Sequence, residues 1–392
     1  MPVSTAVRFL ILLPALGPLV YYCLAIYSGL VYFRRLRRLS PLDRSFTPPV
    51  SILKPVRGLD YRAYENFASF CGLDYPDYEV LFAVADAHDP VIPVIEKLRQ
   101  QYPKQAIRLI VGVAQLGITL KTNSLARLAR EAKHELLVIN DSDVRVEEDY
   151  LRDVVAPFAD PKVGCVTAFF RGMTEGGFAA DVDAVGVPTD SSASTLVART
   201  FGTLDFALGW TMATTKTRLA EIGGFESLVN HHSDDFALGN EIFKRGFRIE
   251  LMRKPVWMVF SRETLRDFFR HELRWSILLK NLRPGGYAAM AMTFGFPWAV
   301  LVTLVVPSFS VALSYFVAYL ALRLAVAWTI GVWGLQDPVV RKRIWLVPVR
   351  DALNLCIYIA SFFSNTVRWR GIAYRVQGRS FVPLAGRPKH GD

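Results

Sequence analysis

Aspartates stand at three separated points of this sequence where predicted strands or helices begin or end. In "LLVINDSDVRVEEDY" (residues 136–150), an aliphatic run stops at Asp141 and Asp143. Ligands collect at the carboxyl ends of strands in open α/β sheets, and two carboxylates there suit a phosphate-bearing Mg²⁺ or Mn²⁺ ion. A simple turn is the alternative interpretation, because Asn-Asp-Ser is ordinary loop chemistry and an aspartate often caps the following helix.

Two further acidic motifs flank this one along the chain. "LFAVADAHDP" ends a strand at Asp86, where a carboxylate can accept hydrogen bonds from a base or ribose; a loop acid without a ligand is the alternative. "HHSDDFALGNEIFKRG" places Asp234 and Asp235 at the start of a helix that ends near Gly246. The helix dipole alone favours acids there, but a carboxylate on a rigid helix end also suits a general base.

Basic residues accompany the acids at two places. "LGITLKTNSLARLA" puts Lys121 just before an amphipathic helix, which makes an anion site, although helix capping by the neighbouring Asn123 or Ser124 explains the motif equally well. "FFRHELRWSILLK" sets a histidine, an arginine and a tryptophan on one helix face. That face suits a diphosphate and a flat apolar acceptor, or a helix that lies on a membrane.

Alternating strand and helix patterns indicate the elements that position these residues. The predicted strands are residues 50–56, 79–85, 107–111 and 136–139, and the predicted helices are 91–101, 122–132 and 147–158. Such alternation predicts a mainly parallel sheet with helices on both faces.

Long apolar stretches at both ends of the chain predict membrane attachment. Residues 9–33 carry no charge, which is long enough to span a bilayer; a cleavable signal peptide would have a shorter core and a small-residue cleavage site. We therefore expect an uncleaved anchor over residues 7–33. The basic run at 34–38 marks its cytoplasmic end and attracts anionic lipids.

The expected C-terminal membrane region, residues 286–366, contains two or three spans followed by a basic tail over 367–392. Its third apolar stretch, 344–363, is interrupted by Arg350 and Asp351 and is either a short span or an interfacial segment. The basic segments 341–343 and 368–375 both look cytoplasmic. They cannot both be inside if that stretch crosses once.

The net charge and the hydrophobic content of the chain indicate which classes of ligand and partner to expect. The net charge of +11 and the 52% hydrophobic content fit a protein at a membrane surface that handles acidic ligands. No nucleic-acid-binding module is recognisable, so nucleic acid is not an expected partner. The four cysteines lack metal or redox spacing and indicate a reducing compartment.

Taken in order, these motifs resemble the processive-type glycosyltransferases of the GT-A fold, and more closely the ceramide glucosyltransferase family. The signature of that family is three separated aspartate sites and [QR]-x-x-R-W. The resemblance covers about residues 48–284 and includes one N-terminal anchor and C-terminal spans. It implies an α/β GT-A nucleotide-diphospho-sugar transferase domain over 48–284.

The resemblance also assigns roles. Asp86 would bind uridine, Asp141 and Asp143 would hold the metal–diphosphate, Asp235 would be the catalytic base, and Lys121, Arg274 and Trp275 would complete the nucleotide-sugar site. Asp234 and His271 would belong to the acceptor or closing motif. His271 stands where the family has Gln or Arg. A His at this position resembles the bacterial relatives that glycosylate hopanoids.

We therefore expect an inverting transfer of a sugar, with glucose favoured, from a UDP-sugar to a membrane lipid hydroxyl, with ceramide as the favoured acceptor. Hopanoid and diacylglycerol are alternative acceptors. A polysaccharide synthase needs a channel, which three or four spans are too few to build. A nucleotide-sugar-binding membrane module is the non-enzymatic alternative. The expected location is a bacterial inner membrane, with the catalytic domain in the cytoplasm.

Overall fold

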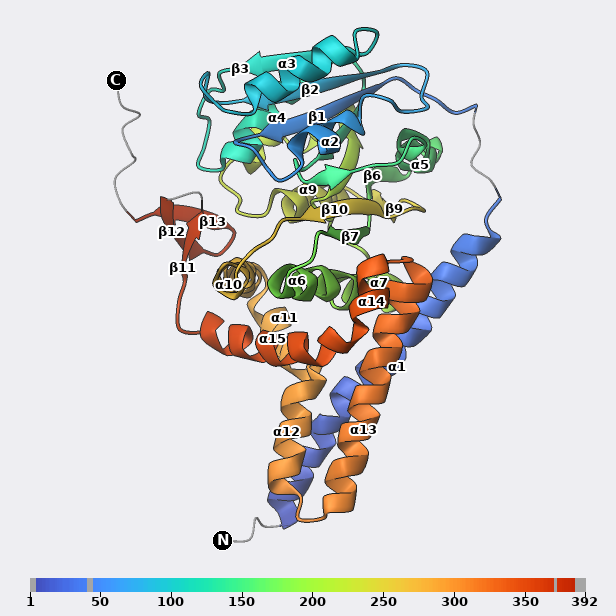
Figure 1. Cartoon of the computed structure of the whole chain (residues 1–392), viewed down its shortest axis with the longest axis vertical. Helices are drawn as coiled ribbons and strands as arrows, with labels where there is room; N and C mark the ends of the chain where they lie inside the picture. The colour runs from blue at the N-terminus through green and yellow to red at the C-terminus, as the bar shows by residue number, and fades with distance from the viewer. Residues whose placement is uncertain (1–4, 41–44, 370–371, 385–392) are drawn as a thin grey trace. The chain divides into compact units, whose positions relative to one another are not determined.

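The computed structural model describes residues 5–40, 45–369 and 372–384 and divides into two compact units (Figure 1). The sheet unit contains Arg38–Met173 and Thr203–Ser261. The helical unit contains Met1–Arg37, Thr174–Gly202 and Arg262–Asp392. The last eight residues of the expected basic tail, 385–392, lie outside the described residues.

A seven-stranded sheet in the order β3-β2-β1-β4-β8-β6-β9 forms the centre of the sheet unit. Its strands are β1 (Val50–Val56), β2 (Tyr78–Val84), β3 (Ala106–Val111), β4 (Leu136–Asn140), β6 (Val163–Thr167), β8 (Thr211–Thr215) and β9 (Arg248–Leu251). β1 pairs in parallel with β2 and β4, whereas β8 runs antiparallel to β4 and β6. The predicted α/β class and mainly parallel sheet are therefore confirmed.

Short helices and a second sheet complete this unit. The helices are α2 (Ala63–Ala68), α3 (Ile92–Gln101), α4 (Leu120–Glu131), α5 (Tyr150–Val155), η1 (Ala156–Ala159), α8 (Lys216–Glu221), η2 (Phe225–Leu228) and α9 (Asp234–Lys244). The second sheet has the order β5 (Val144–Arg145), β10 (Val256–Phe260) and β7 (Phe170–Thr174).

Strand burial and register together place the first acidic motif. Every residue of β2 and β4 is buried, as expected for strands covered on both faces, and all of these residues except Glu79 and Asn140 are hydrophobic. Leu53 of β1 lies opposite Ile139 of β4. The carboxyl ends of these two strands therefore lie side by side, and Asp141 and Asp143 follow β4 at that edge.

The helical unit draws its helices from three parts of the chain. They are α1 (Thr5–Arg38), α6 (Phe178–Thr189), α7 (Ser191–Phe201), α10 (Leu265–Leu282), α11 (Pro284–Ala289), η3 (Met290–Met292), α12 (Gly295–Val305), α13 (Phe309–Val326), η4 (Ala327–Gly334), α14 (Pro338–Arg343), η5 (Ile344–Leu346) and α15 (Val347–Ser361). A small sheet, β11 (Thr366–Trp369), β12 (Ile372–Gln377) and β13 (Ser380–Pro383), follows them.

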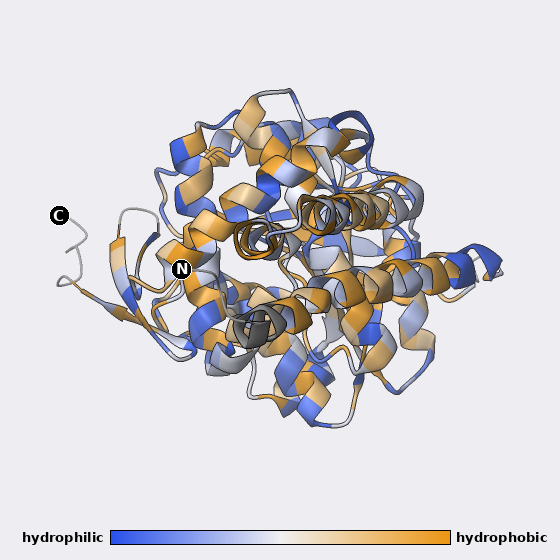
Figure 2. Cartoon of the chain, turned by 90° about the horizontal axis from the view of Figure 1, so that it is seen from below, coloured by the Kyte–Doolittle hydropathy of each residue, from blue (hydrophilic) through white to orange (hydrophobic). Residues whose placement is uncertain are grey.

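Three helical stretches among the described residues are long and apolar enough to cross a membrane, namely Leu12–Arg38, Phe309–Gly334 and Pro338–Ser361. The pair Pro284–Met292 and Gly295–Val305, bent by 51°, makes a fourth if it is one broken span. Figure 2 shows hydrophobic residues along most of α1 and hydrophilic residues at one of its ends. The predicted N-terminal and C-terminal membrane segments are therefore present as candidate spans.

Side-chain contacts hold α1, α12 and α13 together. The Tyr315 hydroxyl donates to the carbonyl of Ala15 at 2.6 Å, and the backbone N–H of Gly295 donates to the Tyr22 hydroxyl at 2.9 Å. In Figure 1, α15 runs across the axes of α12 and α13 instead of along them. It packs on α6 and α10, where Val182, Phe268 and Ile357 share one buried cluster.

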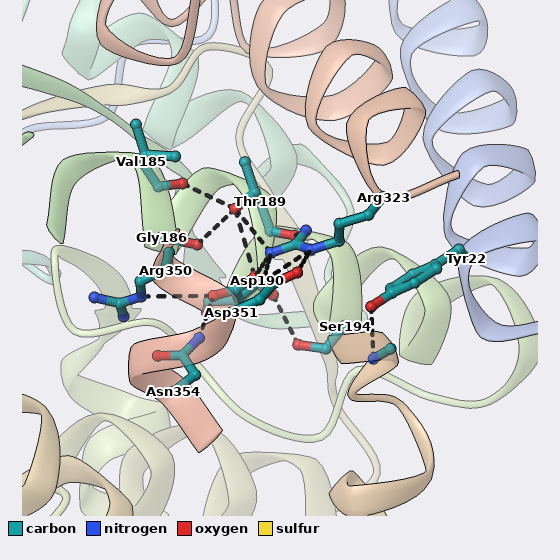
Figure 3. A network of polar contacts seen from close by, with 12 residues as sticks. Tyr22, Val185, Gly186, Thr189, Asp190, Ser194, Arg323, Arg350, Asp351 and Asn354 are labelled. Atoms are coloured by element: carbon teal, nitrogen blue, oxygen red, sulfur yellow. Dashed lines mark hydrogen bonds and ion pairs between the residues drawn. The ribbon is translucent and has the colours of Figure 1, made fainter. Parts of the chain in front are cut away.

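A buried ionic network ties α13 to α15 and to the junction of α6 and α7 (Figure 3). The guanidinium of Arg323 on α13 pairs with Asp351 at 2.9 Å, also pairs with Asp190, and donates to the carbonyl of Thr189 at 3.1 Å. Only 3% of Arg323 is exposed. Because an unpaired charge in an apolar span is costly, these partners are what allow an arginine at this position.

Candidate active site

Lys121, Asp141 and Asp234 meet at one point of the sheet unit. The Lys121 ammonium, on the first turn of α4, lies 2.7 Å from Asp141 Oδ1 and 3.0 Å from Asp234 Oδ2. Burial lowers the pKa of Lys121, but the charges of Asp141 and Asp234 outweigh burial and raise it above its ordinary value. The lysine therefore stays charged and joins the acid after β4 to the acid at the start of α9.

Asp235 follows as the second residue of α9, and the pKa of its carboxylate is raised. Its Oδ1 accepts a 2.7 Å hydrogen bond from the backbone N–H of Phe236. Burial and then the charge of Asp234 raise the pKa of Asp235 to about 6, although Lys121 acts in the opposite direction. A carboxylate with such a pKa is ionised at neutral pH and is more basic than an ordinary aspartate.

Asp143 carries a buried carboxylate oxygen that could bind a cation. Its Oδ1 is buried without a hydrogen-bond partner, and burial, followed by the charges of Asp141 and Asp60, raises the pKa of Asp143 to about 7. A divalent ion would offset this crowding of negative charge. No group of three or more His, Cys, Asp or Glu side chains that could hold a metal occurs in the described residues. Asp141 and Asp143 thus fit an ion of the Mg²⁺ type, which takes one or two carboxylates and completes its shell with phosphates and water.

Lys54 and Asp60, which the sequence analysis missed, form hydrogen bonds with the turn that carries Asp141 and Asp143. Lys54 of β1 is fully buried, donates to the Asp141 carbonyl at 2.9 Å, and lies 3.8 Å from the Phe70 ring centroid. Burial lowers the pKa of Lys54 to about 7, against the opposing charges of Asp141 and Asp143. Ser142 donates a hydrogen bond to Asp60. A lysine inside the apolar run "VSILKPV" was the available signal for Lys54, because a buried lysine needs a partner.

Asp86 lies just beyond the end of β2 and is exposed. Its Oδ1 accepts a 2.9 Å hydrogen bond from the backbone N–H of His88, and 70% of its side chain is accessible. The neighbouring Asp89 instead accepts from the backbone of Gly58 and Val91 and therefore organises the loop. This position leaves the Asp86 carboxylate accessible to a ligand, and its uridine-binding role stays a prediction.

The predicted closing motif lies on α10 of the helical unit. Thr264 caps this helix by accepting from the backbone N–H of Asp267. The Trp275 indole N–H donates to His271 Nε2 at 2.8 Å, and the Arg274 guanidinium lies 5.4 Å from the Trp275 ring centroid. Burial and then the Arg274 charge lower the pKa of His271. The three side chains therefore share one face of α10, as their spacing predicts, with neutral His271 as the acceptor.

The family described as glycosyl transferase family 21 matches residues 15–381. The chain belongs to this family. It is 27% identical over 236 residues to ceramide glucosyltransferase 3 of Caenorhabditis elegans, covering 59% of this chain and 51% of the relative. It is 25% identical over 238 residues to ceramide glucosyltransferase 1 of that organism, covering 60% and 51%. The chain thus spans about half the length of these curated relatives.

Among solved structures, a mannosyltransferase from Pyrobaculum calidifontis in complex with GDP-Man and Mn²⁺ shares the fold. The TM-score is 0.51 at 19% sequence identity, covering 89% of this chain and 99% of that chain. The expected GT-A-type fold and the resemblance to ceramide glucosyltransferases are confirmed. The roles assigned to individual site residues stay predictions.

Proposed function

We propose that this member of glycosyl transferase family 21 transfers a sugar, with glucose favoured, from a UDP-sugar to the hydroxyl of a membrane lipid, with ceramide favoured. The main support is that Lys121 forms ion pairs with both Asp141 and Asp234 in one unit, since these pairs join the turn that carries Asp143 to the helix start that carries Asp235. The names of the matched relatives and the candidate spans support a lipid acceptor.

On the donor side, Asp141 and Asp143 would hold Mg²⁺ or Mn²⁺ against the diphosphate of the UDP-sugar. When bound, the ion would supply positive charge to the leaving diphosphate. Lys54 fixes the backbone of this turn through the carbonyl of Asp141. Asp86, just beyond the end of β2 in the same sheet, would accept hydrogen bonds from the uridine.

On the acceptor side, Asp235 would remove the proton from the lipid hydroxyl. The oxygen then forms a bond to the anomeric carbon as the bond from that carbon to the diphosphate breaks, which inverts the anomeric centre. The Phe236 N–H fixes Asp235 Oδ1. Arg274 would bind diphosphate charge and Trp275 would face the acceptor, with His271 orienting the indole through its 2.8 Å hydrogen bond.

We further propose that the protein lies in a bacterial inner membrane with the sheet unit in the cytoplasm. The basic run at the end of α1 supports this orientation, because positively charged flanks stay on the cytoplasmic side. A free sugar would lack the anchoring that the bilayer gives to a lipid, so soluble acceptors should react only at high concentration.

The direct test combines purified protein, a panel of UDP-sugars, and ceramide, hopanoid and diacylglycerol acceptors, with lipid products identified by mass spectrometry. We expect a hexosyl-ceramide product. If only glycosylated hopanoid or diacylglycerol were found, that lipid and not ceramide would be the acceptor. Elongation of a soluble oligosaccharide with no glycolipid product would contradict the proposal in favour of polymer synthesis.

Variants separate the two halves of the site. Asp235→Asn should abolish transfer and keep UDP binding, whereas Asp141→Asn or Asp143→Asn should weaken metal-dependent UDP binding. Asp77→Asn, which removes an exposed carboxylate of the same unit, is the matched control. If Asp235→Asn kept most of the wild-type kcat, Asp235 would not be the base.

A further inference from the structure

Lys121 makes contacts that a simple phosphate-binding lysine would not need. Its ammonium is bound to Asp141 Oδ1 at 2.7 Å and to Asp234 Oδ2 at 3.0 Å, and only 20% of its side chain is exposed. Asp141 belongs to the predicted metal–diphosphate site, and Asp234 belongs to the predicted acceptor or closing motif and precedes the predicted base Asp235. Lys121 is therefore paired with two protein carboxylates, one of which is a predicted metal ligand.

The ion pair between Lys121 and Asp141 opposes the binding of a metal ion at Asp141. A divalent ion would coordinate a carboxylate oxygen at about 2.0–2.1 Å, which would put it within a few ångströms of the ammonium. Two cations so close repel each other strongly in a partly buried site, where the effective dielectric constant is well below that of water. Each cation therefore weakens the binding of the other at Asp141.

We propose that Lys121 is a built-in competitor of the divalent ion at Asp141, and that it moves to the diphosphate when metal and nucleotide bind together. This inference rests on the proposed donor site. It predicts that metal alone binds weakly, because it must displace the ammonium. The nucleotide gives Lys121 a replacement anion, so metal and nucleotide strengthen each other's binding.

The backbone around Lys121 favours motion of the side chain alone. Thr119, just before α4, donates its backbone N–H to the carbonyl of Val229 at 2.8 Å and its hydroxyl to the carbonyl of His231 at 2.9 Å. These bonds fix the start of α4 to the segment that leads into α9. The flexible lysine side chain can exchange partners while Asp141 and Asp234 stay in place.

Manganese binding followed by electron paramagnetic resonance tests this without requiring sugar transfer. Free Mn²⁺ is titrated in wild type, Lys121→Met, Lys121→Arg and Lys162→Met, with and without UDP. Without UDP, Lys121→Met should bind Mn²⁺ about tenfold more tightly than wild type, a difference of about 1.4 kcal/mol. Lys121→Arg keeps the competing charge and should bind Mn²⁺ no more tightly than wild type. Lys162 is exposed, so Lys162→Met controls for the loss of one positive charge.

The gain in Mn²⁺ affinity on adding UDP should be smaller in Lys121→Met than in wild type. Asp141→Asn should lose the tight Mn²⁺ binding, which ties the signal to this site. Unchanged or weaker Mn²⁺ binding by Lys121→Met without UDP would overturn the competition. So would an increase in Mn²⁺ affinity without UDP in Lys162→Met as large as that in Lys121→Met. The readout is independent of the acceptor, so a failed glycosylation assay would count against the proposed function and not against this competition.

Discussion

Gly209→Ala tests whether the position of the Asp235 carboxylate limits the reaction. A Cβ at Gly209 would lie 3.0 Å from Asp235 Oδ2, whereas ordinary contacts begin at 3.4 Å, so the carboxylate or the Gly209 backbone must move by about 0.4 Å. The backbone angles of Gly209 suit alanine, because its φ lies outside the positive range. The substitution therefore displaces the base without changing its chemistry.

The expected loss follows from this displacement. A misplacement of about 1 Å can cost about 100-fold in rate, so a shift of a few tenths of an ångström predicts about a tenfold loss of kcat. The hydrogen bond from Phe236 to Asp235 Oδ1 resists any compensating rotation. Metal-dependent UDP binding should not change, because Asp141 and Asp143 are untouched. Stability should fall by about 1 kcal/mol, at the low end for overpacking.

Initial rates with a UDP-sugar and lipid acceptor in nanodiscs measure the effect, alongside UDP binding and a melting curve. Gly72→Ala is the matched control, since a Cβ there meets nothing within 4 Å. Gly239→Ala should unfold the unit more readily, because its Cβ would lie 2.3 Å from the backbone nitrogen of Ala207. Wild-type kcat in Gly209→Ala, or an equal loss of UDP binding, would refute the reasoning.

Three further predictions follow from other contacts. Because the raised pKa of Asp235 leaves the base protonated below about pH 6, kcat/KM should fall tenfold per pH unit below that value; an acid limb near pH 4 would contradict it. Arg323→Met should lose about 3–5 kcal/mol of stability, because it leaves buried carboxylates unpaired, and Arg99→Met, which breaks an exposed pair, should lose less than about 1 kcal/mol in the same melting assay. Since α15 crosses α12 and α13, cysteines at Arg341 and Arg375 should react with an impermeant reagent from the same side of the membrane; labelling from opposite sides would make α15 a span.

Local sequence patterns predicted the elements that bury continuous apolar surface. β1 has the predicted bounds, β3 and β4 are each one residue longer at one end, and β2 begins and ends one residue earlier than predicted. β1, β2 and β4 are buried along nearly their whole length, so most of their residues are apolar and the runs are visible in the sequence. β8, "TMATT", was not predicted. Its threonines satisfy buried hydroxyls through specific partners, such as Thr214 with the Gly164 carbonyl at 2.8 Å, which no local pattern reveals.

The sequence predicted individual residues of the candidate site but not the contacts between them. Asp141 and Asp235 stand out because strand ends and helix starts are readable from hydrophobic periodicity. The contact of Lys121 with Asp234 joins α4 to α9 across more than a hundred residues of sequence. Lys54 likewise reaches the carbonyl of Asp141, 87 residues away. Such contacts depend on strand order and helix packing, which a single sequence does not encode locally.

The Arg323 network also sets an order of events during synthesis. Asp190 precedes Arg323 by 133 residues and is made before α13, whereas Asp351 follows it by 28 residues. α13 therefore leaves the ribosome before one of its two carboxylate partners does. An arginine near the middle of a span costs about 2.5–3.5 kcal/mol on insertion. α13 gains its full set of counter-charges only when α15 has followed it, so a later helix of the described residues holds an earlier one in place.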